Sequence, residues 1–314
     1  MRKSWVLAAS AALTFVTPAL AETFKLAVPQ RGLWETAFVE IGAAAGIFKK
    51  EGIDIEPLYT RGGSETVQAV LSGSVDLAVS NGLLGTIGAY SKGAPLRVTG
   101  ASMTGTPDAF WYARTDSGIK RVKDIAGKKI GFSQPGSSTH LIVQALLDHY
   151  KIKAEIVPSG SPSGSFTMTM SKQIDLGWSV PPFRLQEIAE GKVQIVMRGS
   201  EVPSLQDQTV RVHITTAQTL ARKRDLMVRF HRALAATLDY AYSNDAALVE
   251  YAKMAKITPE LARRVRDEFH PKANMQLKEI KGLQQSLDQA LQFKNIAKAM
   301  KPEDVKGLFE ILIP

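Results

Sequence analysis

Three neighbouring hydroxyl side chains, Ser137, Ser138 and Thr139, follow a glycine in the chain. They lie between a predicted short strand over 129–132 and a helix predicted over 140–150. Backbone N–H groups and the helix dipole favour an anion or another acceptor at such a position, and hydroxyl groups add donors that rotate to suit it. The segment therefore predicts a ligand contact, alongside the simpler role of one serine as the N-cap of the helix.

The sequence LSGSVDLAVSN at 71–81 is nearly repeated as MSKQIDLGWSVP at 170–181. Each copy predicts a helix end, a tight turn and a short buried strand whose carboxyl end carries polar groups. Ligands of open α/β sheets bind outside the carboxyl ends of the strands. The two copies therefore predict a cleft between two lobes, lined by Ser80 and Asn81 on one side and by Trp178 and Pro181 on the other.

Five further residues are candidates for ligand contact. Gln30 and Trp34 lie in the first strand-to-helix connection, and Gly63 allows the backbone to approach a ligand closely. Ser64 precedes a predicted helix, and Arg184 can form a charge-assisted pair with an acid group. Two alternatives stay open: Trp34 is equally consistent with a place in the core, and Arg184 with a place on the protein surface.

Patterns typical of enzymes are absent from the sequence. The five histidines are scattered without metal-binding spacing, and the segment 160–164 has proline where a nucleophilic serine would stand. The chain has no cysteine, which excludes thiolate catalysis and disulfides. Asp76 and Asp175 are interpreted as bonding the turns that enter their strands rather than as a catalytic pair. We therefore expect no catalytic residue, no metal and no cofactor.

The elements that position these residues alternate between strand and helix. Strands are predicted over 24–28, 53–59, 76–80 and 96–102, with helices between them, and the same order restarts near residue 110. This alternation predicts an α/β protein with mostly parallel sheets flanked by helices. We expect one lobe over 22–110 and 214–314, a second over 111–213, and two hinge strands at 111–114 and 210–215. The C-terminal helices, with a stripe at Leu226, Phe230, Leu234 and Leu238, complete the first lobe.

The first 21 residues have the pattern of a secretory signal peptide. Arg2 and Lys3 precede an apolar run, and Ala19 and Ala21 form a cleavage site before Glu22. Export to the periplasm without a lipid anchor is expected, since no cysteine is available for lipid attachment. Loss of the signal lowers the formal charge from +9 to +7, and this charge lies mainly on helix faces. Nucleic acid is not an expected partner, because no aromatic residues interleave with the basic ones.

Three segments in this order carry a family resemblance: 43–81, VKDIAGKKIG at 122–131 and PGSST at 135–139. Together they resemble the nitrate/sulfonate/taurine group of ABC-transporter substrate-binding proteins, which have the type II periplasmic-binding-protein fold. The resemblance covers nearly the whole chain after residue 21. It implies a two-lobed monomer that closes by a hinge on a small solute and delivers it to an ABC permease in the membrane.

The nature of the solute stays open at this point. A sulfonate, carboxylate or nitrate-like anion suits the hydroxyl-lined helix start and the positive charge. A neutral amide or heterocycle suits the shortage of arginines in the predicted cleft. Two other functions share the fold: a pyrimidine-related enzyme, and a ligand sensor for a membrane receptor.

Overall fold

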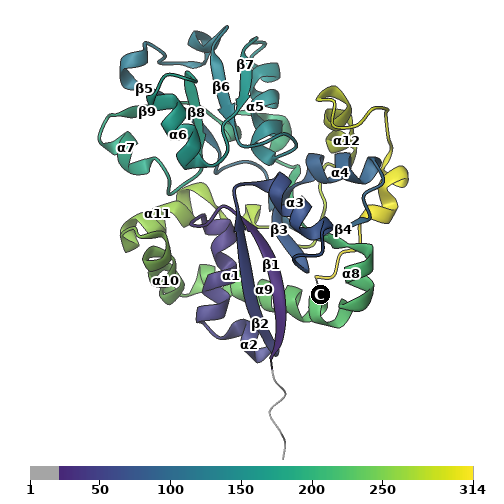
Figure 1. Ribbon diagram of the computed structural model, residues 1–314. Coiled ribbons are helices and arrows are strands. Elements are labelled where there is room, and N and C mark those ends of the chain that lie inside the picture. The colour runs from purple at the N-terminus through teal and green to yellow at the C-terminus, as the bar shows by residue number, and fades with distance from the viewer. Residues whose placement is uncertain (1–20, 314) are drawn as a thin grey trace, which may run out of the picture.

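The computed structural model describes residues 21–313 and consists of two α/β lobes, each built on a five-stranded sheet (Figure 1). The first sheet has the order β2-β1-β3-β10-β4. Strand β10 is antiparallel to both of its neighbours, while the other four strands share one direction. The bounds of its strands are β1 Glu22–Pro29, β2 Ile53–Thr60, β3 Leu77–Gly82, β4 Leu96–Thr104 and β10 Thr209–Thr216.

The second sheet repeats this arrangement with the order β7-β6-β8-β5-β9, and β5 is its antiparallel strand. Its strands are β5 Phe110–Arg114, β6 Lys129–Phe132, β7 Glu155–Pro158, β8 Leu176–Ser179 and β9 Val193–Arg198. The predicted fold class, a two-lobed α/β protein with mostly parallel sheets, is confirmed. In each sheet the antiparallel strand is the one that follows a crossing between the lobes, at 105–109 or at 199–208.

The two strands expected to form a paired hinge lie in different sheets. Strand β5 pairs with β8 and β9, and β10 pairs with β3 and β4. The expected lobe boundary at residue 214 falls inside β10, so residues 209–213 belong to the first sheet. Both strands are almost wholly buried. The composition of such a segment predicts a strand but carries no information about the strand's neighbours in the sheet.

Helices cover both sheets, and the C-terminal ones, green and yellow in Figure 1, return to the first lobe. The stripe predicted on α9 is buried, and the ring of Phe230 packs 5.0 Å from that of Phe24 on β1 and 5.6 Å from that of Phe48. Burying such a stripe against the sheet is the main source of stability for a helix of this type. The second lobe has α5 Ser138–His149, α6 Pro162–Met170 and α7 Leu185–Ala189. The first has α1 Trp34–Ala44, α2 Ile47–Lys50, α3 Gly63–Leu71, α4 Leu83–Ser91, α8 Ala217–Arg222, α9 Arg224–Ser243, α10 Asp245–Ala255, α11 Pro259–Phe269 and α12 Leu283–Gln292.

The repeated sequence motif marks equivalent places in the two lobes, because β3 and β8 are each the third strand of their sheet. Asp76 precedes β3 and accepts a hydrogen bond from the backbone N–H of Lys25 at 3.1 Å. Asp175 precedes β8 and accepts one from the N–H of Lys129 at 2.8 Å. Each aspartate thus ties the start of its strand to the neighbouring strand. This confirms the structural interpretation of both carboxylates.

Candidate functional site

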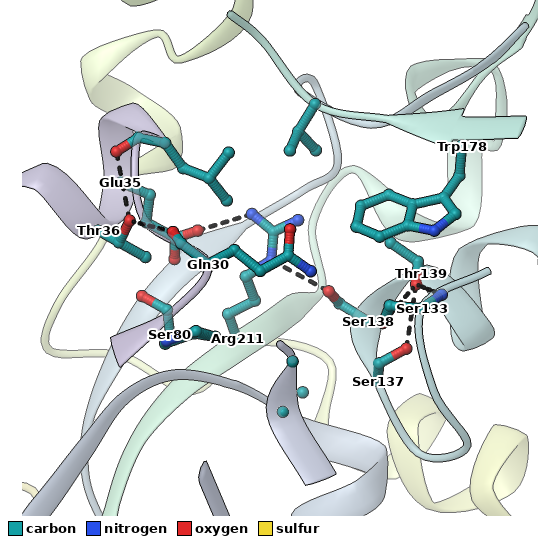
Figure 2. A pocket seen from close by; sticks show the side chains of 16 residues that line it. Gln30, Glu35, Thr36, Ser80, Ser133, Ser137, Ser138, Thr139, Trp178 and Arg211 are labelled. Carbon is teal, nitrogen blue, oxygen red and sulfur yellow. Dashed lines mark hydrogen bonds and ion pairs between the residues drawn. The ribbon is translucent and has the colours of Figure 1, made fainter. Parts of the chain in front are cut away.

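A cavity of about 50 Å³ lies between the lobes, at the carboxyl ends of β1 and β3 in one lobe and of β6 and β8 in the other. Figure 2 shows side chains converging on it from both sides. A water molecule needs roughly 10–15 Å³ of such space, so the lobes here enclose room for a few waters or a very small solute. From the first lobe the lining includes Gln30, Thr36 and Ser80, and from the second Ser133, Ser137 and Trp178.

The wall from the second lobe is the N-terminus of α5. Ser137 is its N-cap and accepts a hydrogen bond from the N–H of His140 at 3.2 Å. Thr139 accepts from the N–H of Ser133 at 2.9 Å and bonds the Ser133 hydroxyl at 3.1 Å. The first N–H groups of a helix have no partner within the helix. This wall therefore offers backbone donors and hydroxyls to the cavity, and a ligand contact at Ser137, Ser138 or Thr139 stays a prediction.

The wall from the first lobe is formed by two strand ends with unusual backbone conformations. Gln30, just after β1, has φ 59°, and Ser80, near the end of β3, has φ 55°. Left-handed backbone is uncommon for residues other than glycine and concentrates at functional sites. Gln30 donates from Nε2 to the Arg61 carbonyl at 3.2 Å, and its Oε1 is buried without a partner among residues 21–313. The Ser80 hydroxyl bonds that of Ser102 at 2.9 Å.

A buried ionic cluster at the base of the cavity was missed by the sequence analysis. Arg211 on β10 donates from Nη1 to Glu35 Oε2 and to Asp108 Oδ2, both at 2.7 Å. Its Nε donates to the Ser138 hydroxyl of the second lobe at 3.2 Å. Burial tends to lower the pKa of Arg211, but the attraction of Asp108 and Glu35 outweighs it and holds this pKa above its usual value. The cluster joins β10, α1, a crossing segment and the opposite lobe.

The sequence did contain one signal for this cluster. In Val210–His213, charged or polar residues alternate with valines inside a predicted strand, which the structure shows to be buried. Buried charges are found paired in folded proteins. Arg211 therefore required a carboxylate partner, although its identity was not readable from sequence spacing.

Two of the predicted ligand contacts lie away from the cavity. The Trp34 side chain is fully buried, donates from Nε1 to the Tyr242 hydroxyl at 3.0 Å and packs edge-on against neighbouring rings. The structure thus favours the core alternative for Trp34. Arg184 pairs with Glu187 at 3.0 Å and lies over the Phe166 ring at 4.0 Å. The guanidinium at the cavity is that of Arg211 instead.

The remaining predicted residues surround the cavity at different depths. Gly63 and Trp178 line it, while Pro181 is buried beyond the end of β8. Ser64 and Asn81 line an adjacent groove of about 400 Å³. The Ser64 hydroxyl donates across the lobes to the Pro135 carbonyl at 2.9 Å. The Asn81 amide is held by Thr66 and by the Val79 carbonyl.

The lobes also meet through glycines. A Cβ atom placed on Gly85 of α4 would lie 2.3 Å from the carbonyl oxygen of Gly136 in the opposite lobe. One placed on Gly82 would lie 2.9 Å from the same oxygen and 2.8 Å from the Ser138 nitrogen. Backbone therefore rests directly on backbone beside the cavity. The lobes are closed upon each other in this structure.

Two negative findings apply to residues 21–313. No group of three or more histidine, cysteine, aspartate or glutamate side chains is placed to hold a metal ion within this range. No helix within it is long and apolar enough to cross a membrane.

The sequence matches one protein family and resembles several known proteins. The family model described as NMT1/THI5 like matches residues 35–247, which is more than half of the chain. A protein of Brucella abortus, provisionally described as a binding protein, is 25% identical over 269 residues, which cover 82% of this chain and 80% of that protein.

Solved structures share the fold at low sequence identity. The alkanesulfonate-binding protein SsuA from Xanthomonas axonopodis pv. citri, bound to MOPS, is 13% identical with a TM-score of 0.72, covering 93% of this chain and 96% of that one. The nitrate-binding protein NrtA from Synechocystis PCC 6803 is 13% identical with a TM-score of 0.73, covering 92% and 86%. The desulfurization enzyme DSZB is 14% identical with a TM-score of 0.63, covering 90% and 95%. At these identities the likeness establishes the fold alone.

Proposed function

The chain belongs to the NMT1/THI5-like family, and on that premise we propose that it captures a small solute between its lobes and delivers it to the permease of an ABC import system. The observation that carries the proposal is the cavity between the lobes, with the α5 N-terminus on one side and the Gln30 and Ser80 strand ends on the other. A ligand that contacts both lobes favours the closed state by its differential affinity. The two crossings, 105–109 and 199–208, are the segments about which the lobes would move.

The proposed setting is the periplasm, with the protein working as a monomer that meets the permease transiently. The signal peptide predicted over residues 1–21, on which the proposed export depends, lies outside the described residues except for Ala21. Periplasmic location is supported by the structural likeness to the periplasmic nitrate-binding protein NrtA.

We propose binding rather than catalysis, although DSZB has the same fold. A serine or threonine nucleophile needs an adjacent general base. The hydroxyls of Ser137, Ser138 and Thr139 instead bond a backbone N–H, a guanidinium or one another. No histidine is among the residues that line the cavity within 21–313, and the Glu35 carboxylate, which does line it, bonds Ser102 and Arg211 rather than any of these three hydroxyls. The sensor alternative uses the same cavity and differs only in the membrane partner.

Native mass spectrometry of the purified protein, followed by solution scattering, tests this proposal. We expect a small molecule to co-purify, and its removal by unfolding and refolding to increase the radius of gyration. Adding it back should restore the compact form and raise the melting temperature. Conversion of the bound molecule to a product would support the enzyme alternative, and unchanged scattering on removal would contradict closure about a solute.

Replacing Ser138 with alanine is expected to weaken solute binding by a few-fold to about a hundredfold. The substitution removes a hydroxyl at the cavity and leaves Arg211 Nε without its bond to the second lobe. Ser137→Ala should instead lower the free energy of unfolding by about 1 kcal/mol, since Ser137 caps α5. Calorimetric titration and melting curves measure the two effects. The matched control is Ser163→Ala, an exposed serine of the same lobe; equal affinities of all three variants would contradict the assignment.

A further inference from the structure

The charges at the cavity bear on the kind of solute it accepts. Among residues 21–313, Glu35 and Arg211 are the only charged side chains that line it. Figure 2 shows the Arg211 guanidinium between Glu35 and Ser138. Both side chains are more than nine-tenths buried, so water screens them little.

The positive charge of Arg211 is already matched inside the protein. Its Nη1 donates to one carboxylate oxygen of Glu35 and to one of Asp108. Two carboxylates thus face one guanidinium, and the second oxygen of Asp108 has no hydrogen-bond partner among residues 21–313. By formal charge the cluster thus holds two carboxylates and one guanidinium, and the Arg211 Nη2 atom donates no hydrogen bond within residues 21–313.

The nearby histidines do not correct this imbalance. The Nε2 atom of His270 lies 3.9 Å from Asp108, but burial lowers the pKa of His270, which keeps the ring neutral at neutral pH. His213 is near Glu35 on the side away from the cavity, and burial lowers its pKa to about 3. The facing wall of the second lobe contributes no charged side chain to the lining, so its positive character comes from the helix N-terminus.

The Glu35 carboxylate is held in a fixed position with capacity to accept further bonds. Its Oε1 accepts from the Ser102 hydroxyl at 2.6 Å, and Ser102 is bonded in turn to Ser80. Its Oε2 accepts from Arg211. Each carboxylate oxygen has two lone pairs, so each can accept one more hydrogen bond, and Glu35 is among the residues that line the cavity. The cavity therefore has an acceptor side at Glu35 and a donor side at α5.

We infer that Glu35 determines specificity: the site takes a small solute without net negative charge, such as a zwitterion or a neutral amide, that directs a hydrogen-bond donor to Glu35 and an acceptor to α5. This inference rests on the proposed solute-binding function. Of the two alternatives that the sequence left open, it favours the neutral or zwitterionic solute over the anion, because two carboxylates already face one guanidinium and a fully anionic solute would add a further negative charge beside them. A donor facing Glu35 forms a charge-assisted bond.

Three matched probes test the inference: acetate as the anion, glycine as the zwitterion and acetamide as the neutral molecule. At equal millimolar concentrations and constant ionic strength, we expect glycine or acetamide to raise the melting temperature of the wild-type protein more than acetate does. A greater rise with acetate would overturn the inference while leaving the solute-binding function in place. No rise with any of the three would count against both.

Glycine and acetamide carry N–H donors and acetate does not. The variant Glu35→Gln should lower the ratio of the affinity for glycine or acetamide to the affinity for acetate by about ten- to a hundredfold. The matched control is Glu40→Gln on the same helix, since Glu40 bonds Arg31 and Tyr59 away from the cavity. Asp108→Asn removes one charge behind the cavity and should reduce the discrimination against acetate while the Glu35 contact remains. This second variant keeps the test decisive if Glu35→Gln is poorly folded. Preferences equal to wild type in both variants would overturn the role of Glu35.

Discussion

Replacing Gly85 with alanine is expected to hold the lobes apart and to weaken solute binding by about five- to 150-fold. The added Cβ atom would lie 2.3 Å from the Gly136 carbonyl oxygen and 2.9 Å from its carbon. Both are backbone atoms of the opposite lobe, so no side-chain rotation can relieve the clash. The closed state must open or shift, while the open state is unaffected.

The first lobe itself should not be weakened by this change. Gly85 lies inside α4, where alanine is favoured over glycine by about 1 kcal/mol. We therefore expect Gly85→Ala without solute to melt at a temperature equal to or above that of the wild type. Its affinity for the solute should be lower, and its radius of gyration in the presence of the solute should be larger. This opposite movement of stability and affinity separates a closure defect from a folding defect.

The matched control for closure is Gly63→Ala, which adds the same methyl group to the same side of the cleft; because Gly63 lines the cavity, this variant does not serve as a control for affinity. Its Cβ would approach no atom closer than 3.9 Å, which is ordinary van der Waals contact. This variant should close as the wild type does in solution scattering. If Gly85→Ala also closes and binds normally, the glycine contact is not a feature of the solute-bound state.

A steep loss of stability in acid is the second expected result, and its source is a pair of buried histidines. His213 on β10 and His231 on α9 have ring centroids 5.8 Å apart in the core of the first lobe. None of their four ring nitrogens has a hydrogen-bond partner among residues 21–313. Burial lowers the pKa of His213 to about 3, and burial together with His213 lowers that of His231 well below its usual value.

The direction of the pH effect follows from these shifts. Below pH about 6.5 the two histidines take up protons in the unfolded chain but stay neutral in the folded protein. The unfolded state then binds more protons, so the free energy of unfolding falls as the pH falls. Each histidine contributes a slope of up to about 1.4 kcal/mol per pH unit, continuing down to pH about 3 for His213. His140 and His270, whose pKa values are also lowered by burial, act in the same direction.

Urea unfolding at a series of pH values measures this slope. The variant His213→Leu removes one titrating group and should reduce the slope by up to about 1.4 kcal/mol per pH unit. At neutral pH it should retain the stability of the wild type, since the ring nitrogens it removes have no partner to lose. Replacement of the exposed His149 by glutamine is the control. A slope that His213→Leu leaves unchanged would show that these rings do not stay neutral in the folded protein.

The features that could be predicted from sequence are those set by neighbours along the chain. The alternation of strands and helices, the stripe on α9 and the cap at Ser137 all depend on residues within a few positions of one another. The repeat at 71–81 and 170–181 correctly indicated two equivalent lobes. Among the predicted ligand contacts, the structure brings seven to the cavity: Gln30, Gly63, Ser80, Ser137, Ser138, Thr139 and Trp178. They were predictable because each ends a strand or begins a helix at the sheet edge where ligands bind.

The charge of the cavity was decided only by the tertiary structure. Arg211 lies 176 positions from Glu35 and 103 from Asp108, and these residues meet because β10 enters the first sheet between β3 and β4. Helical periodicity, likewise, did not show that Trp34 faces the core. The sequence by itself determined the local elements and the polar strand ends, since short-range periodicity and capping specify them. Strand order decides which buried charges neutralise one another, and lobe packing decides how closely the lobes approach at Gly85 and Gly136. Both bring together residues that no local sequence pattern connects.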